Sequence, residues 1–542
     1  MKRIHPSAWL LALSSGVLQV LVFPRPGLYF LCWVCIAPLI YSILRAREAD
    51  ASQLLAERDT FSYLVPATIP QGFLLGWLSG FITYAGSCSW VYHVMHLYGG
   101  LAPTTAFLLL ILFSFFIGLH HAIFGALLAW AARSRAGFSR KALVLAPFLW
   151  VAVELLRTYV VSFPWDLLGT AQIDNTSLVR LAAVTGVYGI SFEIALVNTA
   201  FAAAFLVRIG RRRTMMAAAA TAAVVLQATA LVKFDHFPTD HTARLVQLNL
   251  PLNDEWNAEN YPKRLQALLD LSKAETHGSP TPSVIVWPES PGPFFVNDPT
   301  FLQALGRLSA NGSYVIAGSL GIKEQQSKAP QLLYNSAVAV GPNGTIQSRY
   351  DKIHLVPWGE YVPYKSLFAF AESLTHQIGT FEPGTQRVPL QLGSTRYGVF
   401  ICYESVFPAE VSQFADHGAE VFVNISNDGW FGESGAPAQH LNMARMRAVE
   451  NQRWILRATN TGITAVIDPM GRVISTLPRN QAAVLDADYS TSAEVTIYTR
   501  YGDWFPIGCA IISLCGLLWR ERPEIGPEEP TNTARNRIPQ HG

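Results

Sequence analysis

Gly398-Val399-Phe400-Ile401-Cys402-Tyr403-Glu404 is a short apolar run that ends in a thiol and a carboxylate. Such a run, rich in β-branched and aromatic residues, is typical of a buried strand. Cys402 then lies where the strand ends, and open α/β sheets carry reactive side chains at this edge because the loops leave room for a ligand. A buried structural cysteine is the simpler interpretation, since free cysteine is among the most buried residue types.

The chain around this run divides into apolar and globular parts. Of its 542 residues 50% are hydrophobic and only 14% are charged, which is unusually apolar for a soluble protein. Residues 1–232 consist of long uncharged stretches, residues 233–500 resemble an ordinary globular domain, and residues 503–519 are apolar again. The net charge of +2 comes without a basic patch, so we expect no nucleic-acid partner.

Eight segments satisfy the requirement for a membrane-spanning helix, which is roughly 20 mainly apolar residues. They cover about 7–23, 27–44, 72–95, 104–132, 142–161, 183–207, 214–232 and 503–519. In the third segment Gly72, Gly76 and Gly80 recur at every fourth position, which permits close helix contact. We therefore predict a transmembrane region of seven helices over residues 1–232 and an eighth transmembrane helix within residues 501–522.

The positions of the cations predict the orientation of these helices. Four cation-rich segments alternate with cation-poor loops, and by the positive-inside rule they lie in the cytoplasm. Their members are Lys2 and Arg3; Arg45, Arg47 and Arg58; Arg133, Arg135, Arg140 and Lys141; and Arg208, Arg211, Arg212 and Arg213. This topology places residues 233–500 outside the cytoplasm and the tail 523–542 inside it. The tail is polar and rich in proline, so we expect it to be disordered.

The external part alternates strand-like and helical patterns, which favours a layered α/β domain. We expect strands at Ala243–Leu248, Ser283–Trp287, Tyr314–Ser319, Leu333–Val340, Gly398–Cys402, Val421–Ser426 and Thr464–Ile467. Helices are expected at Tyr261–Thr276, Thr300–Ser309, Ala409–His417 and Pro437–Arg457.

Cysteine usage favours a chemical role for Cys402. It is the only cysteine of the external part, since the other five, Cys32, Cys35, Cys88, Cys509 and Cys515, fall in predicted spans. An unpaired thiol outside the cytoplasm is exposed to oxidation, so its presence requires a reason. Nucleophilic catalysis is one such reason, but it requires a base and a group that stabilises the oxyanion.

Two other strand ends supply those groups. Val284-Ile285-Val286-Trp287-Pro288-Glu289 ends in a carboxylate, and Arg349-Tyr350-Asp351-Lys352-Ile353 places an ammonium in a hydrophobic segment. Each residue alone has a simpler explanation, Glu289 as a turn or helix cap and Lys352 as a surface charge. Together with Cys402 they form a candidate catalytic set.

These motifs carry a family resemblance. Trp287-Pro288-Glu289, Asp351-Lys352 followed by Pro357-Trp358-Gly359-Glu360, and Ile401-Cys402-Tyr403-Glu404 resemble the Glu, Lys and Cys motifs of the nitrilase superfamily. With Asn424-Ile425-Ser426-Asn427-Asp428-Gly429-Trp430-Phe431-Gly432 they resemble its membrane branch, the bacterial apolipoprotein N-acyltransferases. The resemblance implies an αββα sandwich, inserted before the last helix of an eight-helix bundle in the bacterial inner membrane, with the catalytic domain on the periplasmic side.

The same resemblance implies a reaction. An acyl chain passes from a membrane phospholipid, through a cysteine thioester, to the N-terminal amine of a diacylated apolipoprotein, the last step of lipoprotein maturation. Glu289 would be the general base, Cys402 the nucleophile and Lys352 the oxyanion stabiliser. We expect no cofactor, no metal and a monomeric enzyme.

Further residues receive auxiliary roles from the family pattern. Glu360 and Glu404 would orient Lys352 and shape proton traffic, Tyr403 would help to position the acyl group, and Asn335 matches another polar position. Aromatic residues near the site are candidates for a lipid entrance, although loop aromatics also simply pack. They are Trp256, Trp358, Trp430 and Phe431.

Two questions stay open at the level of the sequence. The segment Tyr361–Phe381 has an apolar stripe at helical spacing, which fits either a membrane-dipping lid or a helix packed on the core.

The second question is the function. The same three catalytic groups would also serve a membrane-tethered amidase that hydrolyses a small carbon–nitrogen bond. In a third hypothesis the helices form a transporter, which the scarcity of intramembrane charges beyond Glu154 and Arg157 argues against.

Overall fold

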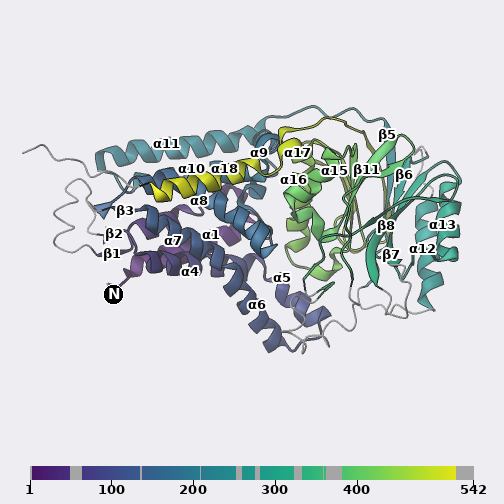
Figure 1. Cartoon of the computed structure of the whole chain (residues 1–542), viewed down its shortest axis with the longest axis horizontal. Coiled ribbons are helices and arrows are strands. Elements are labelled where there is room, and N and C mark those ends of the chain that lie inside the picture. The colour runs from purple at the N-terminus through teal and green to yellow at the C-terminus, as the bar shows by residue number, and fades with distance from the viewer. Residues whose placement is uncertain are drawn as a thin grey trace, which may run out of the picture.

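The computed structural model describes residues 3–48, 64–134, 137–207, 209–251, 259–274, 281–322, 332–357, 359–361 and 381–519. A helical part and a part built on two sheets lie side by side (Figure 1). The predicted tail 523–542 lies outside the described residues, as does the segment Tyr361–Phe381 apart from its two end residues.

Helices occupy all eight positions at which the sequence predicts a span. The helical part contains α1 (Pro6–Val22), α2 (Ala37–Leu44), α4 (Ile69–Ser87), α5 (Trp90–His93), α6 (Pro103–Ile117), α7 (Leu119–Ala131), α8 (Lys141–Leu156), α9 (Ala182–Thr185), α10 (Val187–Ala204), α11 (Ile209–Ala228) and, from the chain's end, α18 (Trp504–Leu518). Among the described residues, four stretches are long and apolar enough to cross a membrane: Pro103–Ala131, Lys141–Val161, Val187–Ala204 and Arg211–Leu231. The remaining apolar helices are shorter, so the number of eight spans stays a prediction.

The predicted glycine contact holds α4 against α7. A Cβ atom at Gly76 would lie 2.1 Å from the carbonyl oxygen of His121, and one at Gly72 would lie 2.4 Å from that of Gly125. Both distances are far shorter than a van der Waals contact, so larger side chains would force the helices apart. The expected close approach at the glycine face is confirmed.

The long fourth segment is divided at Gly118 into two helices. The second of them, α7, packs inside the bundle, whereas α6 leaves the bundle toward α5 (Figure 1). The projecting helix α6 exposes large apolar side chains at Phe107, Leu108, Leu112, Phe115 and Phe116. Such a surface is stable where lipid, and not water, covers it.

Two six-stranded mixed sheets form the second part. The first has the order β16-β5-β6-β7-β8-β9, and the second has the order β10-β11-β12-β13-β14-β15. The strands are β5 (His241–Gln247), β6 (Val284–Val286), β7 (Tyr314–Ile322), β8 (Leu333–Val340), β9 (Ile346–Asp351), β10 (Leu390–Leu392), β11 (Thr395–Ile401), β12 (Val421–Ser426), β13 (Ile455–Thr459), β14 (Ala465–Ile467), β15 (Val473–Thr476) and β16 (Ala483–Tyr489). Strands β5, β6 and β7 are parallel, as are β11, β12 and β13. Two short hairpins, β1–β2 (Arg47–Glu48, Leu64–Val65) and β3–β4 (Arg133–Ser134, Gly137–Phe138), belong to the helical part.

Helices cover the outer face of each sheet, which gives the αββα order of layers (Figure 1). On the first sheet lie α12 (Asn260–Lys273) and α13 (Pro299–Ser309), and on the second lie α15 (Pro408–Asp416) and α16 (Ala436–Asn451), with α17 (Ile497–Tyr501) beside them. Alternation along β6 explains the layering, because Ile285 packs with the helices α12 and α13 while its neighbours Val284 and Val286 join the core shared by both sheets.

One predicted helix is too long. The expected helix Pro437–Arg457 ends at Asn451, because Gln452 adopts a left-handed conformation with φ of 51°. The chain then enters β13, a fully buried strand between β12 and β14. A short run of consecutive apolar residues has neither the helical nor the strand periodicity, so the sequence pattern could not show where the helix ends and the strand begins.

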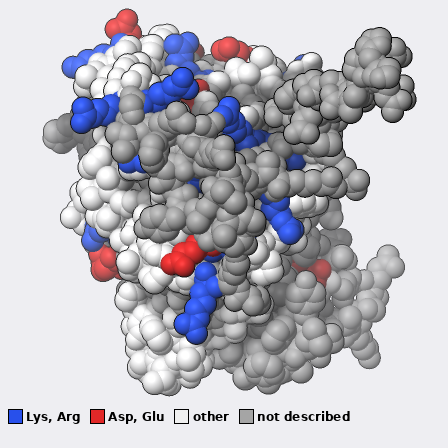
Figure 2. All heavy atoms as spheres, turned by 90° about the vertical axis from the view of Figure 1, so that its left-hand side faces the viewer, with Lys and Arg blue, Asp and Glu red and all other residues white. Residues whose placement is uncertain are grey.

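Lys and Arg side chains gather on the end of the helical part that faces away from the sheets (Figure 2). The hairpins β1–β2 and β3–β4 lie at this end in Figure 1. Described cations of the predicted cytoplasmic segments that reach the surface are Arg3, Arg47, Arg133, Arg140, Lys141, Arg211, Arg212 and Arg213.

Candidate active site

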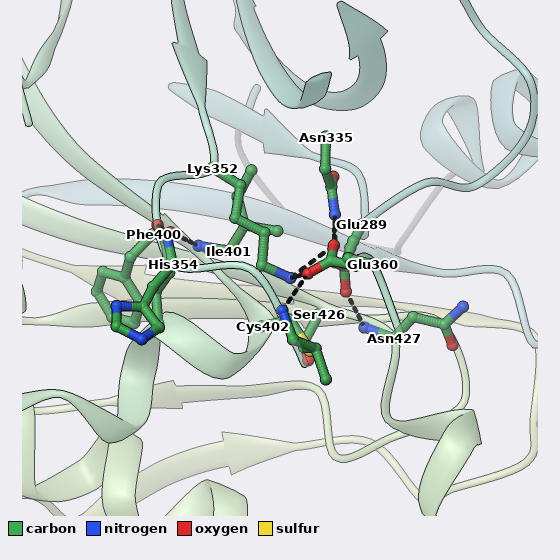
Figure 3. Close-up of polar contacts among 12 residues, drawn as sticks. Glu289, Asn335, Lys352, His354, Glu360, Phe400, Ile401, Cys402, Ser426 and Asn427 are labelled. Atoms are coloured by element: carbon green, nitrogen blue, oxygen red, sulfur yellow. Dashed lines mark hydrogen bonds and ion pairs between the residues drawn. The ribbon is translucent and has the colours of Figure 1, made fainter. Parts of the chain in front are cut away.

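The ends of three strands bring Glu289, Lys352 and Cys402 to one place. Glu289 follows β6, Lys352 follows β9, and Cys402 follows β11. The Lys352 Nζ lies 3.3 Å from Glu289 Oε1 and 2.9 Å from Glu360 Oε2. In Figure 3 these three side chains point toward one another next to Cys402.

The Lys352 ammonium is buried between two carboxylates. Its side chain is 1% exposed, and such burial alone would lower its pKa. The negative charges of Glu360 and Glu289 outweigh that effect and raise the pKa of Lys352 above its usual value. The side chain therefore stays a cation, which is the form that stabilises an oxyanion.

Hydrogen bonds fix the Glu289 carboxylate on both oxygens. Asn335 Nδ2 donates to Glu289 Oε1 at 2.7 Å and to Glu360 Oε1 at 2.8 Å, so one amide group holds both carboxylates. The backbone N–H of Asn427 donates to Glu289 Oε2 at 2.8 Å. A carboxylate held in this way is oriented to accept a proton from a neighbouring group.

Cys402 lies in a sharp turn after its strand. Its φ is 52°, which is unfavourable for a residue with a side chain and costs about 1–3 kcal/mol. The residue is 8% exposed. Burial raises the pKa of its thiol, the charge of Glu289 adds to this effect, and the charge of Lys352 opposes it. The resting group is a thiol, so attack requires a base to remove its proton.

Glu404 holds the Lys352 segment against the cysteine strand. It accepts hydrogen bonds of 2.7 Å from the backbone N–H of Ile401, the backbone N–H of Ile353 and the Tyr350 hydroxyl, and one of 3.1 Å from the backbone N–H of His354. Burial raises the pKa of Glu404, and these donors oppose the shift. The resemblance implies that Glu404 orients Lys352. In the structure Glu404 contacts the residues that follow Lys352 through the backbone N–H groups of Ile353 and His354, and its role stays a prediction.

Tyr403 and Phe431 face the helical part. The Tyr403 hydroxyl donates to the carbonyl oxygen of Ser162 at 2.8 Å. Phe431 packs edge-on against Trp90 and Trp165, with ring centroids 5.1 Å and 5.6 Å apart. These residues belong to one apolar cluster that joins the site to the helices.

Among the other predicted entrance residues, Trp430 packs against Tyr98 with ring centroids 5.6 Å apart. Tyr98 belongs to a π-helical turn, Val94–Tyr98, that follows α5. Trp256 and Trp358 lie outside the described residues.

Asp428 and His440 were missed as site residues. Ligand atoms of Cys402, Asp428 and His440 lie within 4.8 Å of one another, which is a spacing that could hold a metal ion. Asp428 instead accepts hydrogen bonds from Ser426 Oγ and Arg457 Nη2 at 2.7 and 2.6 Å, and its Oδ1 lies 2.9 Å from His440 Nδ1. The Arg457 cation opposes a metal at this point. Asp428 belongs to the motif Asn424–Gly432 that carries the family resemblance, so the sequence could have indicated it. His440 belongs to none of the motifs, and no sequence spacing distinguishes it.

The chain matches two families along its length. The carbon-nitrogen hydrolase family matches residues 242–496, and the apolipoprotein N-acyltransferase N-terminal domain matches residues 15–200. An apolipoprotein N-acyltransferase of Geobacter metallireducens is 33% identical over 92% of this chain and 93% of its own. One of Methylococcus capsulatus is 32% identical over 94% of this chain and 95% of its own. A carbon-nitrogen hydrolase structure from Helicobacter pylori covers 46% of this chain and 89% of its own, with 17% identity and a TM-score of 0.35.

These matches define a membrane protein of the nitrilase superfamily, in which a carbon-nitrogen hydrolase domain follows a helical part. At this level of identity and coverage the particular family is also clear. The chain belongs to the apolipoprotein N-acyltransferase family.

Proposed function

We propose that this protein N-acylates apolipoproteins, with a membrane phospholipid as donor and a thioester on Cys402 as intermediate. The convergence of Glu289, Lys352 and Cys402 beside the apolar cluster at the helical part is the observation that carries the proposal. A nucleophile, a base and a buried cation suit acyl transfer. Their position next to the helices suits substrates that are both lipids.

In the first half-reaction Glu289 accepts the thiol proton of Cys402. The sulfur attacks an ester carbonyl of the phospholipid, and Lys352 stabilises the oxyanion that develops. The carbon–oxygen bond then breaks while Glu289 returns the proton to the departing oxygen. The products are a lysophospholipid and an acyl thioester on Cys402.

In the second half-reaction the N-terminal α-amine of the diacylglyceryl-cysteine attacks the thioester carbonyl. A carbon–nitrogen bond forms, the carbon–sulfur bond breaks, and Glu289 takes up the proton that the amine loses and passes it to the sulfur. The lipoprotein leaves with a third acyl chain, and the enzyme is a free thiol again. Because the donor leaves before the acceptor reacts, the kinetics are ping-pong.

Both substrates would reach the site from the side of the membrane. The aromatic cluster around Phe431 and Trp90, and the exposed apolar face of α6, support an entrance on this side. The cations at the opposite end of the helical part support a cytoplasmic location for that end. The catalytic domain would then lie on the periplasmic side of the bacterial inner membrane, in a monomeric enzyme that needs no cofactor.

Mass spectrometry of a diacylated lipopeptide, incubated with purified protein and phospholipid, tests the proposal. We expect the lipopeptide amine to gain one acyl group, and no gain with Cys402→Ala. Release of free fatty acid without lipopeptide acylation would contradict the proposal and favour the alternative, a hydrolytic amidase. Membership of an acyltransferase family argues against the transporter hypothesis.

A further inference from the structure

We propose that His440 is a positioning residue for Cys402, and that Trp165 of the helical part holds His440 in place. This inference deepens the proposed function and rests on it for the role of Cys402. His440 lies on α16 and is completely buried. It would set the turn that presents the thiol, and it would connect that turn to the helices that face the lipid.

Both ring nitrogens of His440 are engaged. Nδ1 lies 2.9 Å from Asp428 Oδ1, and Nε2 lies 3.1 Å from the carbonyl oxygen of Cys402 and 2.8 Å from Ser405 Oγ. A carbonyl oxygen can only accept a hydrogen bond, so the hydrogen bond to Cys402 requires a proton on Nε2. Nδ1 also lies 3.1 Å from Arg457 Nη2. The Ser405 hydroxyl adds a further polar contact at Nε2.

The hydrogen bond to Cys402 matters because of the backbone conformation there. A residue with a side chain does not adopt a φ of 52° without compensation from its surroundings. In this turn the carbonyl oxygen of Cys402 lies 3.1 Å from His440 Nε2, so the hydrogen bond favours the conformation that directs the thiol to Glu289 and Lys352. Asp428, itself held by Arg457, orients the ring.

Trp165 connects this arrangement to the helical part. Its ring stacks on His440 with centroids 5.8 Å apart and an interplanar angle of 18°. Its Nε1 donates to Gln439 Oε1 at 2.8 Å, and its carbonyl oxygen accepts from Arg157 Nη1 at 2.9 Å. Gln439 Nε2 in turn donates to the carbonyl oxygen of Ser87 at 3.1 Å. Trp165 therefore joins His440 to the helical part, and Gln439, the neighbour of His440 on α16, contacts the end of α4 at Ser87.

The test compares two amides at position 440. In His440→Gln the amide nitrogen comes close to the place of Nε2, whereas in His440→Asn it comes closer to the place of Nδ1. We expect the rate of acyl-enzyme formation at saturating phospholipid to fall about 10- to 100-fold in H440N, the effect of a slightly misplaced nucleophile. H440Q should retain a larger share of the rate, and KM should change little in either variant.

Trp165→Phe and Trp165→Ala test the connection. W165F keeps a ring to stack on His440 and should lose little, whereas W165A should slow acylation, and the effects of W165A and H440N should be less than additive. His236, which is exposed in the loop before β5, provides the control variant His236→Asn. Thermal unfolding of each variant identifies those that do not fold.

A second measurement separates this inference from the proposed function. Alkylation of Cys402 by iodoacetamide, followed by peptide mass mapping, needs no lipid. If wild-type protein forms no acyl-enzyme, the proposed function is wrong. The alkylation rates still test the role of His440, because we expect Cys402 to react fastest in wild type, more slowly in H440Q and slowest in H440N. Equal rates for H440Q and H440N, or a wild-type rate in H440N, would overturn the inference by either readout.

Discussion

Lys352 sets the charge balance of the site. Its ammonium is buried against the carboxylates of Glu289 and Glu360. Removal of this positive charge leaves two buried negative charges without a cation to neutralise them. We expect Lys352→Met to abolish acyl transfer and to lower the free energy of unfolding by about 3–5 kcal/mol. Lys263→Met is the matched control, because Lys263 pairs with Glu259 on the surface and its loss should cost less than about 1 kcal/mol.

The pH dependence of this stabilisation follows from the pKa of Lys352. The raised pKa of Lys352 keeps its stabilising contribution complete below its unfolded pKa of about 10.4, and the contribution is lost only as pH rises through the still higher folded value. The free energy of unfolding that wild type has in excess of K352M should therefore not decline between about pH 7 and pH 9. A decline within this window, measured by denaturant unfolding, would contradict the raised pKa of Lys352.

Glu289 should act mainly on the rate of chemistry. Glu289→Gln keeps the shape of the side chain but cannot accept the thiol proton, so thioester formation should slow by about 10²- to 10⁴-fold. The measurement is single-turnover acylation of the enzyme by labelled phospholipid. Glu259→Gln, on the surface, should match wild type. Unchanged kinetics in E289Q would exclude Glu289 as the base.

At the residue scale, the sequence motifs indicated the groups that carry charge or a thiol. Glu289, Lys352, Cys402, Glu360 and Asn335 could be named because each stands in or beside a motif. His440 could not, since a histidine on a buried helix face looks like any core residue. The N–H of Asn427 is a backbone group, and no side-chain pattern reports where a backbone donor points.

At the scale of elements, strand positions followed from apolar runs bounded by turns. Five strands of the two sheets were not predicted: β9, β10, β13, β15 and β16. Strand β13 was missed because its run Ile455–Thr459 directly follows a helix and the left-handed Gln452 that separates them carries no turn signal. The division of the fourth span into α6 and α7 was likewise not predicted, since Gly118 lies within an uninterrupted apolar stretch.

The contact between α4 and α7 should not tolerate a methyl group. In Gly76→Ala the new Cβ would lie 2.1 Å from the His121 carbonyl oxygen, so the helices must separate, at a cost of about 1–3 kcal/mol. Gly508→Ala on α18 is the control, because no atom lies within 4 Å of its added Cβ. Thermal unfolding in detergent should show a lower melting temperature for G76A than for G508A, and equal values would contradict the close packing.

For the whole molecule, the cations and the catalytic domain should lie on opposite sides of the membrane. A membrane-impermeant maleimide should label Glu259→Cys in intact spheroplasts, whereas Arg140→Cys should react only after permeabilisation. Both positions are exposed, and the wild-type protein gives the background of its native cysteines. The reverse pattern would contradict the proposed orientation.

The central claim is that Cys402 carries the acyl group between donor and acceptor. The most direct measurement is the intact mass of the purified protein after incubation with phospholipid in the absence of an acceptor. We predict a gain of one acyl group on wild type, its release when a diacylated lipopeptide is added, and no gain on Cys402→Ala. An acylated Cys402→Ala protein, or acylation of the lipopeptide by that variant, would contradict the claim.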